Sequence, residues 1–188
     1  MTLGARLIAQ DRRVNALQIY LSKPLTRAEY IFGKLGILIS FLLFITWLPA
    51  MLLLVVQVVF AGSFAFVLAN AYLVPAITLY AAIEVVMIST AMLALSSLST
   101  NSRFVGILYT GLIFFSVAIF RVLQFITGST RLSWMAFNND LAQVGDAIFR
   151  VPLHFETPWI VSLLMIVALV AASCLVLERR IRGVEIVV

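Results

Sequence analysis

The sequence predicts an all-α integral membrane protein with about four transmembrane helices, an N-terminal amphipathic helix and a short external helical segment. Of its 188 residues, 63% are hydrophobic and only 11% are charged. A soluble domain of this size needs a polar exterior and cannot bury two-thirds of its residues. The apolar stretches are also longer and more continuous than barrel strands, which alternate over about ten residues. Helices satisfy their own backbone hydrogen bonds in lipid, so helices are the expected spanning elements.

Residues 1–30 form the first predicted segment, which is polar compared with the rest of the chain. Its apolar side chains fall on one side of a 3.6-residue helix, at Leu7, Val14, Leu17 and Leu21. Pro24 ends this helix, because the residue before a proline disfavours helical geometry. The residues alone leave two roles open for the helix: an anchor with its basic face on anionic lipid, or a docking element for a cytoplasmic partner.

Four apolar stretches predict the spans of a transmembrane domain that covers residues 31–177. They run over residues 31–59, 72–98, 104–126 and 158–177, and each is long enough to cross a hydrocarbon core of about 30 Å. A polar interruption at residues 127–157 separates the last two spans, and its apolar residues recur at helical spacing: Leu141, Val144, Ile148 and Phe149. We therefore expect an external segment with a short surface helix there, followed after the last span by a tail at residues 178–188.

The distribution of basic residues predicts the orientation of the spans. Ten of the 13 lysines and arginines lie in or near the N-terminal segment, the loop of residues 99–103 and the C-terminus. The other three, Arg121, Arg131 and Arg150, lie toward the opposite side. The positive-inside rule then places both termini in the cytoplasm, in a multi-pass protein of the cell inner (cytoplasmic) membrane. Membrane orientation also accounts for the net charge of +5 without nucleic-acid binding.

The sequence contains no motif for catalysis or metal binding. The GxxxxGK[ST] phosphate loop, HExxH and CxxC are all missing from it. His154 is the one histidine, and with no partner at ligand spacing it is expected to be a solvated surface residue. Cys174 lies in an apolar run, where a buried, inert thiol is expected. We therefore predict that the chain is not an enzyme and holds no cofactor of its own, so another subunit would supply the energy for any pumping.

Two ionisable residues lie inside predicted spans. Glu84 is near the middle of the second span, where insertion scales put a charge at roughly 2.5–3.5 kcal/mol. It either lines a polar passage and binds substrate, or it is a structural carboxylate that is protonated or paired with a neighbouring helix. Arg121, nearer the outer end of the third span, is the basic candidate. Tyr80, Ser89 and Thr90 surround Glu84 in the sequence and would form a hydrogen-bonded seam between helices.

Three segments of the sequence, taken in order, carry a resemblance to a known family. The first is Leu7–Lys34, with Asp11-Arg12-Arg13, then Leu21-Ser22-Lys23-Pro24-Leu25, and Gly33-Lys34 where the chain enters the membrane. The second is Asn138–Leu141 with Gly145–Phe149, and the third is the ending Leu177–Val187. In this order, and over nearly the whole chain, the three segments resemble ABC-2-type permeases, the membrane subunits of ABC exporters.

The resemblance implies a function, partners and contact residues. In that family the first segment contains a coupling helix that packs against a separate ATPase subunit. ATP-driven closure of two ATPases then switches the spans between inward- and outward-facing states. The resemblance therefore implies a permease subunit, with ATP and Mg²⁺ bound by a P-loop ATPase partner, and with a second permease copy or paralogue and membrane lipid as further partners. The implied ATPase contacts are Asp11, Arg12, Arg13, Leu17, Tyr20, Leu21 and Pro24.

The number of spans departs from the family pattern. Family members usually have six, two of them before the coupling segment, whereas this sequence predicts four. We expect a truncated start, and a shortened relative is the alternative. A shortened relative motivates a second hypothesis, a non-transporting membrane scaffold or immunity protein derived from such a permease. A membrane-embedded enzyme is the third, and it would need more polar groups converging near Glu84 than the sequence offers.

Overall fold

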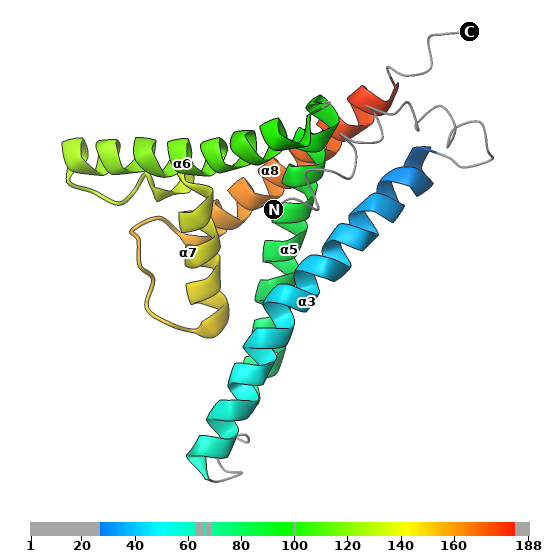
Figure 1. The fold of residues 1–188 in the computed structure, drawn as a ribbon. Coiled ribbons are helices and arrows are strands. Elements are labelled where there is room, and N and C mark those ends of the chain that lie inside the picture. Colours follow the sequence, from blue (N-terminus) through cyan, green and yellow to red (C-terminus); the bar gives the residue numbers. More distant parts are fainter. Residues whose placement is uncertain (1–26, 63–65, 67–68, 100, 183–188) are drawn as a thin grey trace, which may run out of the picture.

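The computed structural model describes residues 27–62, 66, 69–99 and 101–182, and these ranges contain helices and turns but no strand. Four of the helices are long and apolar enough to cross a membrane, as the prediction of about four transmembrane helices requires. They are α3 (Arg27–Ala61), α5 (Leu73–Leu98), α6 (Ser102–Thr127) and α8 (Trp159–Arg182) (Figure 1). The predicted N-terminal amphipathic helix lies outside the described residues, together with all seven predicted ATPase contacts.

Helix α5 is the centre of the fold. It contacts α3, α6, α7 and α8. Of the residues in its most apolar 18-residue stretch, 50% are buried, compared with 0% in the corresponding stretch of α3. Its buried face consists largely of small residues: Ala76, Ala81, Ser89, Thr90, Ala91, Ala94, Ser96 and Ser97. Small side chains let helix backbones approach closely, which matters in lipid because no hydrophobic force drives one helix onto another there. The composition of this face therefore explains why α5 takes the central position.

Helix α3 runs beside α5 and packs through one narrow side (Figure 1). Leu38 of α3 is buried against Ala91 and Met92 of α5. Closer to its N-terminal end, Ile31 and Leu35 pack against a buried cluster of α5 and α8 residues. Most of the remaining large apolar side chains of α3 are exposed, including Phe32, Phe44, Leu53, Val59 and Phe60. In a membrane, lipid or another chain must cover this surface.

Helix α6 diverges from the other long helices. It begins at a cap in which Asn101 Oδ1 accepts a hydrogen bond from the Arg103 backbone N–H at 3.1 Å. It ends at Gly128, whose φ of 65° is a left-handed conformation that glycine adopts without a steric penalty. Figure 1 shows α6 running across one end of α5 instead of alongside it. The long helices therefore do not close into a bundle, and the aromatic residues on α6 stay exposed: Phe104, Phe114, Phe115 and Phe125.

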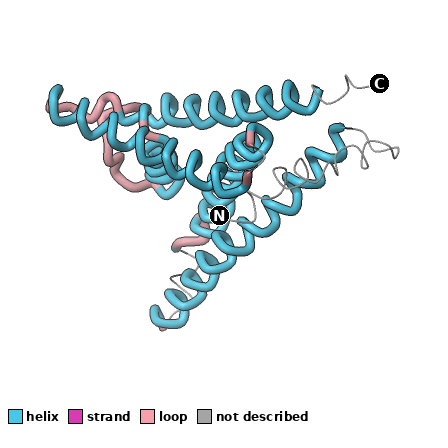
Figure 2. Tube along the Cα trace, turned by 45° about the horizontal axis from the view of Figure 1, so that its top comes forward, coloured by secondary structure: helices cyan, strands magenta, loops and turns pink. Residues whose placement is uncertain are grey.

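Helix α7 (Phe137–Phe149) forms where the apolar spacing predicts a short helix. It packs against α5 and α8 (Figures 1 and 2), and its buried residues are Asp140, Leu141, Gln143, Val144 and Gly145. The two helices approach closely at Gly145, where a Cβ atom would lie 2.8 Å from the ring of Tyr80 on α5. A glycine at this point lets α7 pack directly on the central helix, while Asn138 and Ala142 stay exposed.

Replacing Gly145 with alanine should disrupt this contact. The added methyl group collides with the half-buried Tyr80 ring, which itself packs on Phe149 with ring centroids 5.8 Å apart. We expect Gly145→Ala to destabilise the protein by about 1–3 kcal/mol, as overpacked sites usually do. Thermal unfolding in detergent measures the loss.

Gly111→Ala on α6 is the matched control, because a Cβ atom there meets nothing within 4 Å. Alanine also has the better helix propensity, so this variant should be at least as stable as the parent protein. Equal melting temperatures for Gly145→Ala and Gly111→Ala would contradict the tight crossing of α5 and α7.

Candidate functional site around helix α7

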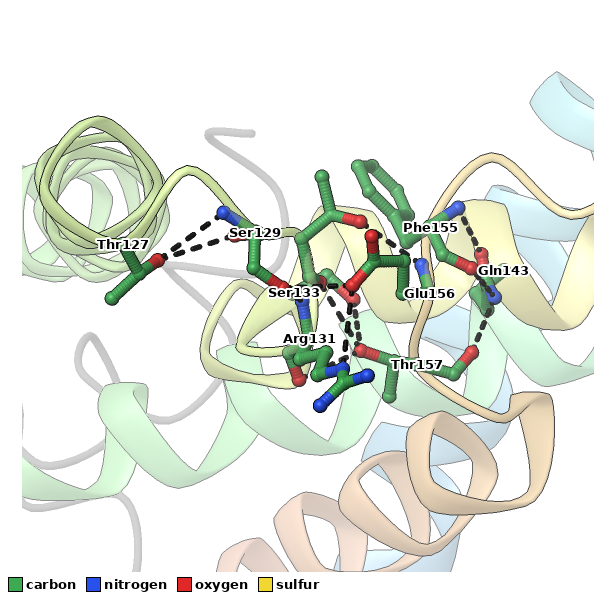
Figure 3. A network of polar contacts seen from close by, with 9 residues as sticks. Thr127, Ser129, Arg131, Ser133, Gln143, Phe155, Glu156 and Thr157 are labelled. Carbon is green, nitrogen blue, oxygen red and sulfur yellow. Dashed lines mark hydrogen bonds and ion pairs between the residues drawn. The ribbon is translucent and has the colours of Figure 1, made fainter.

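Gln143 is the central polar residue of the connecting segment, which we define as residues 128–158 between α6 and α8. Its side chain is fully buried. Its Nε2 atom donates to the backbone carbonyls of Phe155, at 2.9 Å, and of Thr157. Its Oε1 atom accepts from the Phe155 N–H at 3.2 Å. One amide on α7 thus pairs with the chain just before α8, as a neighbouring strand would (Figure 3).

Thr157 joins the loop after α7 to the loop before it. Its hydroxyl oxygen accepts from Ser133 Oγ at 2.8 Å, and lies 3.0 Å and 3.3 Å from the carbonyl oxygens of Arg131 and Thr130. The Glu156 N–H donates to Thr130 Oγ1 at 3.0 Å. At the exposed edge, Arg131 and Glu156 form an ion pair at 3.4 Å (Figure 3). Both loops around α7 are therefore fastened to each other, and buried backbone groups that lack water gain partners.

Replacing Gln143 with leucine should release this fastening. The variant keeps an apolar group in the core but leaves the Phe155 N–H and two carbonyls without partners. Each buried group left unpaired costs about 1–3 kcal/mol. We expect a lower melting temperature in detergent and faster tryptic cleavage after Arg150.

The control for this variant is Gln57→Leu, at an exposed position on α3. It makes the same chemical change without disturbing the connecting segment, so it should leave tryptic cleavage after Arg150 unchanged. If both variants resist trypsin as the parent does, Gln143 does not hold the loop.

Asp140 is a buried carboxyl group about one helical turn before Gln143 on α7. Its side chain is fully buried, and neither carboxyl oxygen has a hydrogen-bond partner within the described part of the chain. The Oγ of Ser162 on α8 and the Nδ2 of Asn139 are also buried without partners there. Burial raises the pKa of Asp140 to about 7, and the nearby Ser162 hydroxyl offsets only part of that rise. The proton on Asp140 therefore leaves near neutral pH.

The raised pKa of Asp140 predicts how stability depends on pH. The ordinary pKa is 3.8 and the folded value is about 7, so the folded state binds the extra proton between these values. Stability should fall as pH rises from about 4 to about 7, by at most about 1.4 kcal/mol per pH unit, and level off above that. Asp140→Asn, which cannot ionise, should lose this dependence in melting temperatures measured from pH 5 to pH 8.

Glu156→Gln tests whether the effect belongs to Asp140. Glu156 is an exposed carboxylate in the same segment, so its replacement should keep the fall in stability between pH 5 and pH 7. Parallel pH profiles for Asp140→Asn and the parent protein would rule out Asp140 as the titrating group.

Glu84 and Arg121, the two predicted intramembrane polar residues, are not brought together. Glu84 is half-buried on α5 and has no ion pair or hydrogen bond with another described residue. Arg121 is exposed on α6, where its Nη1 lies 3.5 Å from Gln124 Oε1. Ser89 and Thr90 also do not supply the predicted hydrogen bonds between helices, because their hydroxyls donate to carbonyls of their own helix. The sequence places these hydroxyls on the second span, but the nearest hydrogen-bond acceptor for a serine or threonine inside a helix is a backbone carbonyl of the preceding turn.

The surroundings of His154 and Cys174 differ in part from those predicted. His154 is exposed, as expected, but its Nδ1 lies 2.7 Å from Asp146 Oδ2, and its N–H donates to the same oxygen at 3.0 Å. The turn that ends α7 brings the pair together, since Arg150 adopts a left-handed φ of 57°. Cys174 is exposed on α8 and not buried as expected. An apolar run cannot distinguish a face toward protein from a face toward lipid, which explains the error.

A cavity of about 770 Å³ lies between α5, α7 and the start of α8. Its walls are mostly apolar, with Leu79 and Ile83 from α5 and Leu163 from α8, while Asp146 and Arg150 contribute polar groups from the end of α7. Within the described ranges, no group of three or more histidine, cysteine, aspartate or glutamate residues is placed to hold a metal ion. The arrangement is suited to binding an amphipathic molecule.

Comparison of the chain with protein-family models, with curated proteins and with solved structures finds no match.

Proposed function

We propose that the chain is the permease subunit of an ATP-binding cassette exporter of the ABC-2 type, driven by a separate ATPase. The observation that carries this proposal is the segment Leu7–Lys34, with its polar Asp11-Arg12-Arg13 stretch followed by the Leu21–Leu25 turn. This segment leads directly into the first apolar span. In the proposed arrangement it lies in the cytoplasm with both termini, and the protein resides in the inner membrane.

The length of α3 supports a coupling role for the segment that precedes it. The helix begins at Arg27 and continues for 35 residues, passing Pro49 without a break. At the helical rise it is about 52 Å long, whereas the hydrocarbon core is about 30 Å thick. The helix is therefore long enough to extend from the span into the polar region beside the coupling segment. A displacement of the segment would then move the span as one rigid body.

The uncovered surfaces of α3 and α6 support a role as a subunit of a larger assembly. No residue in the most apolar 18-residue stretch of α3 is buried within the chain. On α6, the side chains of Phe114, Phe115 and Phe125 are exposed. A second permease copy or a paralogue, together with lipid, would cover these faces in the proposed dimer. ATP and Mg²⁺ would bind to the partner ATPase, because this sequence lacks a phosphate-binding loop.

Replacement of Asp11, Arg12 and Arg13 together by alanine tests the proposal. Affinity-tagged protein is purified from its native membranes, and co-purifying P-loop ATPases are identified by mass spectrometry. We expect an ATPase with the parent protein and at least a tenfold loss with the triple variant, because the proposed contact is removed.

The matched control replaces Glu178, Arg179 and Arg180 by alanine. It removes one acidic and two basic residues, the same charges as the first triple variant, from the other end of the chain. This control should retain the ATPase. Equal retention by both variants, or no ATPase with the parent protein, would contradict the proposal.

The alternative is a non-transporting membrane scaffold or an immunity protein derived from such a permease. One observation supports it, since Glu84 forms no ion pair with another described residue. Vesicles that contain the chain and its captured ATPase distinguish the two functions. Stimulated ATP hydrolysis with substrate movement supports the permease, and stimulation without movement supports the scaffold.

A further inference from the structure

The cavity between α5, α7 and α8 continues as a groove along two of the long helices. A second hollow of about 320 Å³ lies between α5 and α8, and its lining is entirely apolar. The two hollows share Ile83 and Leu163 as lining residues. One continuous surface therefore leads from a partly polar mouth at the end of α7 to a purely apolar end at Val86 and Val170.

The length of this groove corresponds to one leaflet of a membrane. Along α8 it extends from Trp159 to Val170, which is about 16 Å at the helical rise. Half of a hydrocarbon core is about 15 Å. Trp159 is partly exposed at the start of α8, and tryptophan concentrates at the level of the lipid head groups. The mouth of the groove thus lies at head-group depth, and the apolar end lies near the bilayer centre.

Arg150 is the group at the mouth that can bind an anion. Asp146 is already engaged, because its Oδ2 accepts from both the N–H and the ring of His154. Arg150 has no ion pair within the described part of the chain, and its guanidinium lies over the Tyr72 ring at 5.0 Å from the centroid. This contact leaves the N–H groups of the guanidinium edge available, and they suit a phosphate oxygen.

We propose that this groove binds one anionic phospholipid, with its phosphate at Arg150 and an acyl chain along α5 and α8. Three features of the groove match parts of that molecule. Arg150 at the mouth suits the phosphate, Trp159 lies at the depth of the head group, and the apolar lining suits an acyl chain. The site does not depend on the chain being a permease, so it can be tested separately from the proposed function.

Quenching of Trp159 fluorescence by brominated lipid tests the site. The other two tryptophans, Trp47 and Trp134, are first replaced by phenylalanine, and the purified protein in maltoside detergent is titrated with brominated phosphatidylglycerol. We expect saturable quenching, with weaker binding of brominated phosphatidylcholine. Arg150→Asn should weaken binding of the anionic lipid about fivefold, as expected for one basic residue at a membrane surface. Asparagine is used because it tolerates the left-handed backbone at this position.

A second pair of variants tests the acyl position. Val167 lines the apolar hollow and is exposed on α8, so Val167→Phe should fill the groove without disturbing the core and should reduce quenching. Val161 lies on the same helix outside the lining, and Val161→Phe should have no effect. Equal affinity for both lipids, no response to Arg150→Asn or Val167→Phe, or the same saturation with a brominated detergent would overturn the site.

Discussion

The close packing of α5 is the constraint on which the rest of the structure depends. Its alanine, serine and threonine residues give α3, α7 and α8 a surface they can approach closely. The hydroxyls of Ser89, Thr90 and Ser97 each donate to a carbonyl of the same helix, so these small buried polar side chains have a hydrogen-bond partner within α5. Larger residues on this face would separate α7 from α5, and the groove between them would change shape.

The polar contacts of the molecule are concentrated where the chain leaves the long helices. Gln143 and Thr157 supply partners for backbone groups in the loops on either side of α7 (Figure 3). Phe155 adds an apolar contact, since its ring packs edge-on against Phe120 of α6 with centroids 5.7 Å apart. Asp140 is the exception, because burial without a hydrogen-bond partner for either carboxyl oxygen raises its pKa to about 7. The same short helix therefore carries Gln143, which has hydrogen-bond partners in the loop, and Asp140, whose buried carboxyl oxygens have none in the described part of the chain.

Hydropathy and length are sufficient to predict the helical membrane type, because long uncharged stretches have few other stable solutions. Apolar spacing also predicts the helix at Phe137–Phe149. It cannot predict the burial of that helix, which depends on the meeting of Gly145 with Tyr80, two residues far apart in the sequence. The burial of Gln143 cannot be predicted from the sequence either, because it depends on hydrogen bonds to Phe155 and Thr157, which lie more than ten residues further along the chain. The pairing of Asp146 with His154 likewise requires the turn at Arg150, a left-handed conformation that arginine rarely adopts.

The network around Thr157 has a consequence for the length of the loop after α7. Gln143 binds both Phe155 and Thr157, while Asp146 binds His154, so the register of the chain from Val151 to Pro158 is fixed at three positions. Surface loops usually tolerate insertions well, but here one extra residue between His154 and Thr157 would break the register of these contacts. An epitope tag or a reporter domain placed between these two residues would therefore disrupt the pairing of the loop with α7, although the loop itself is largely solvent-exposed.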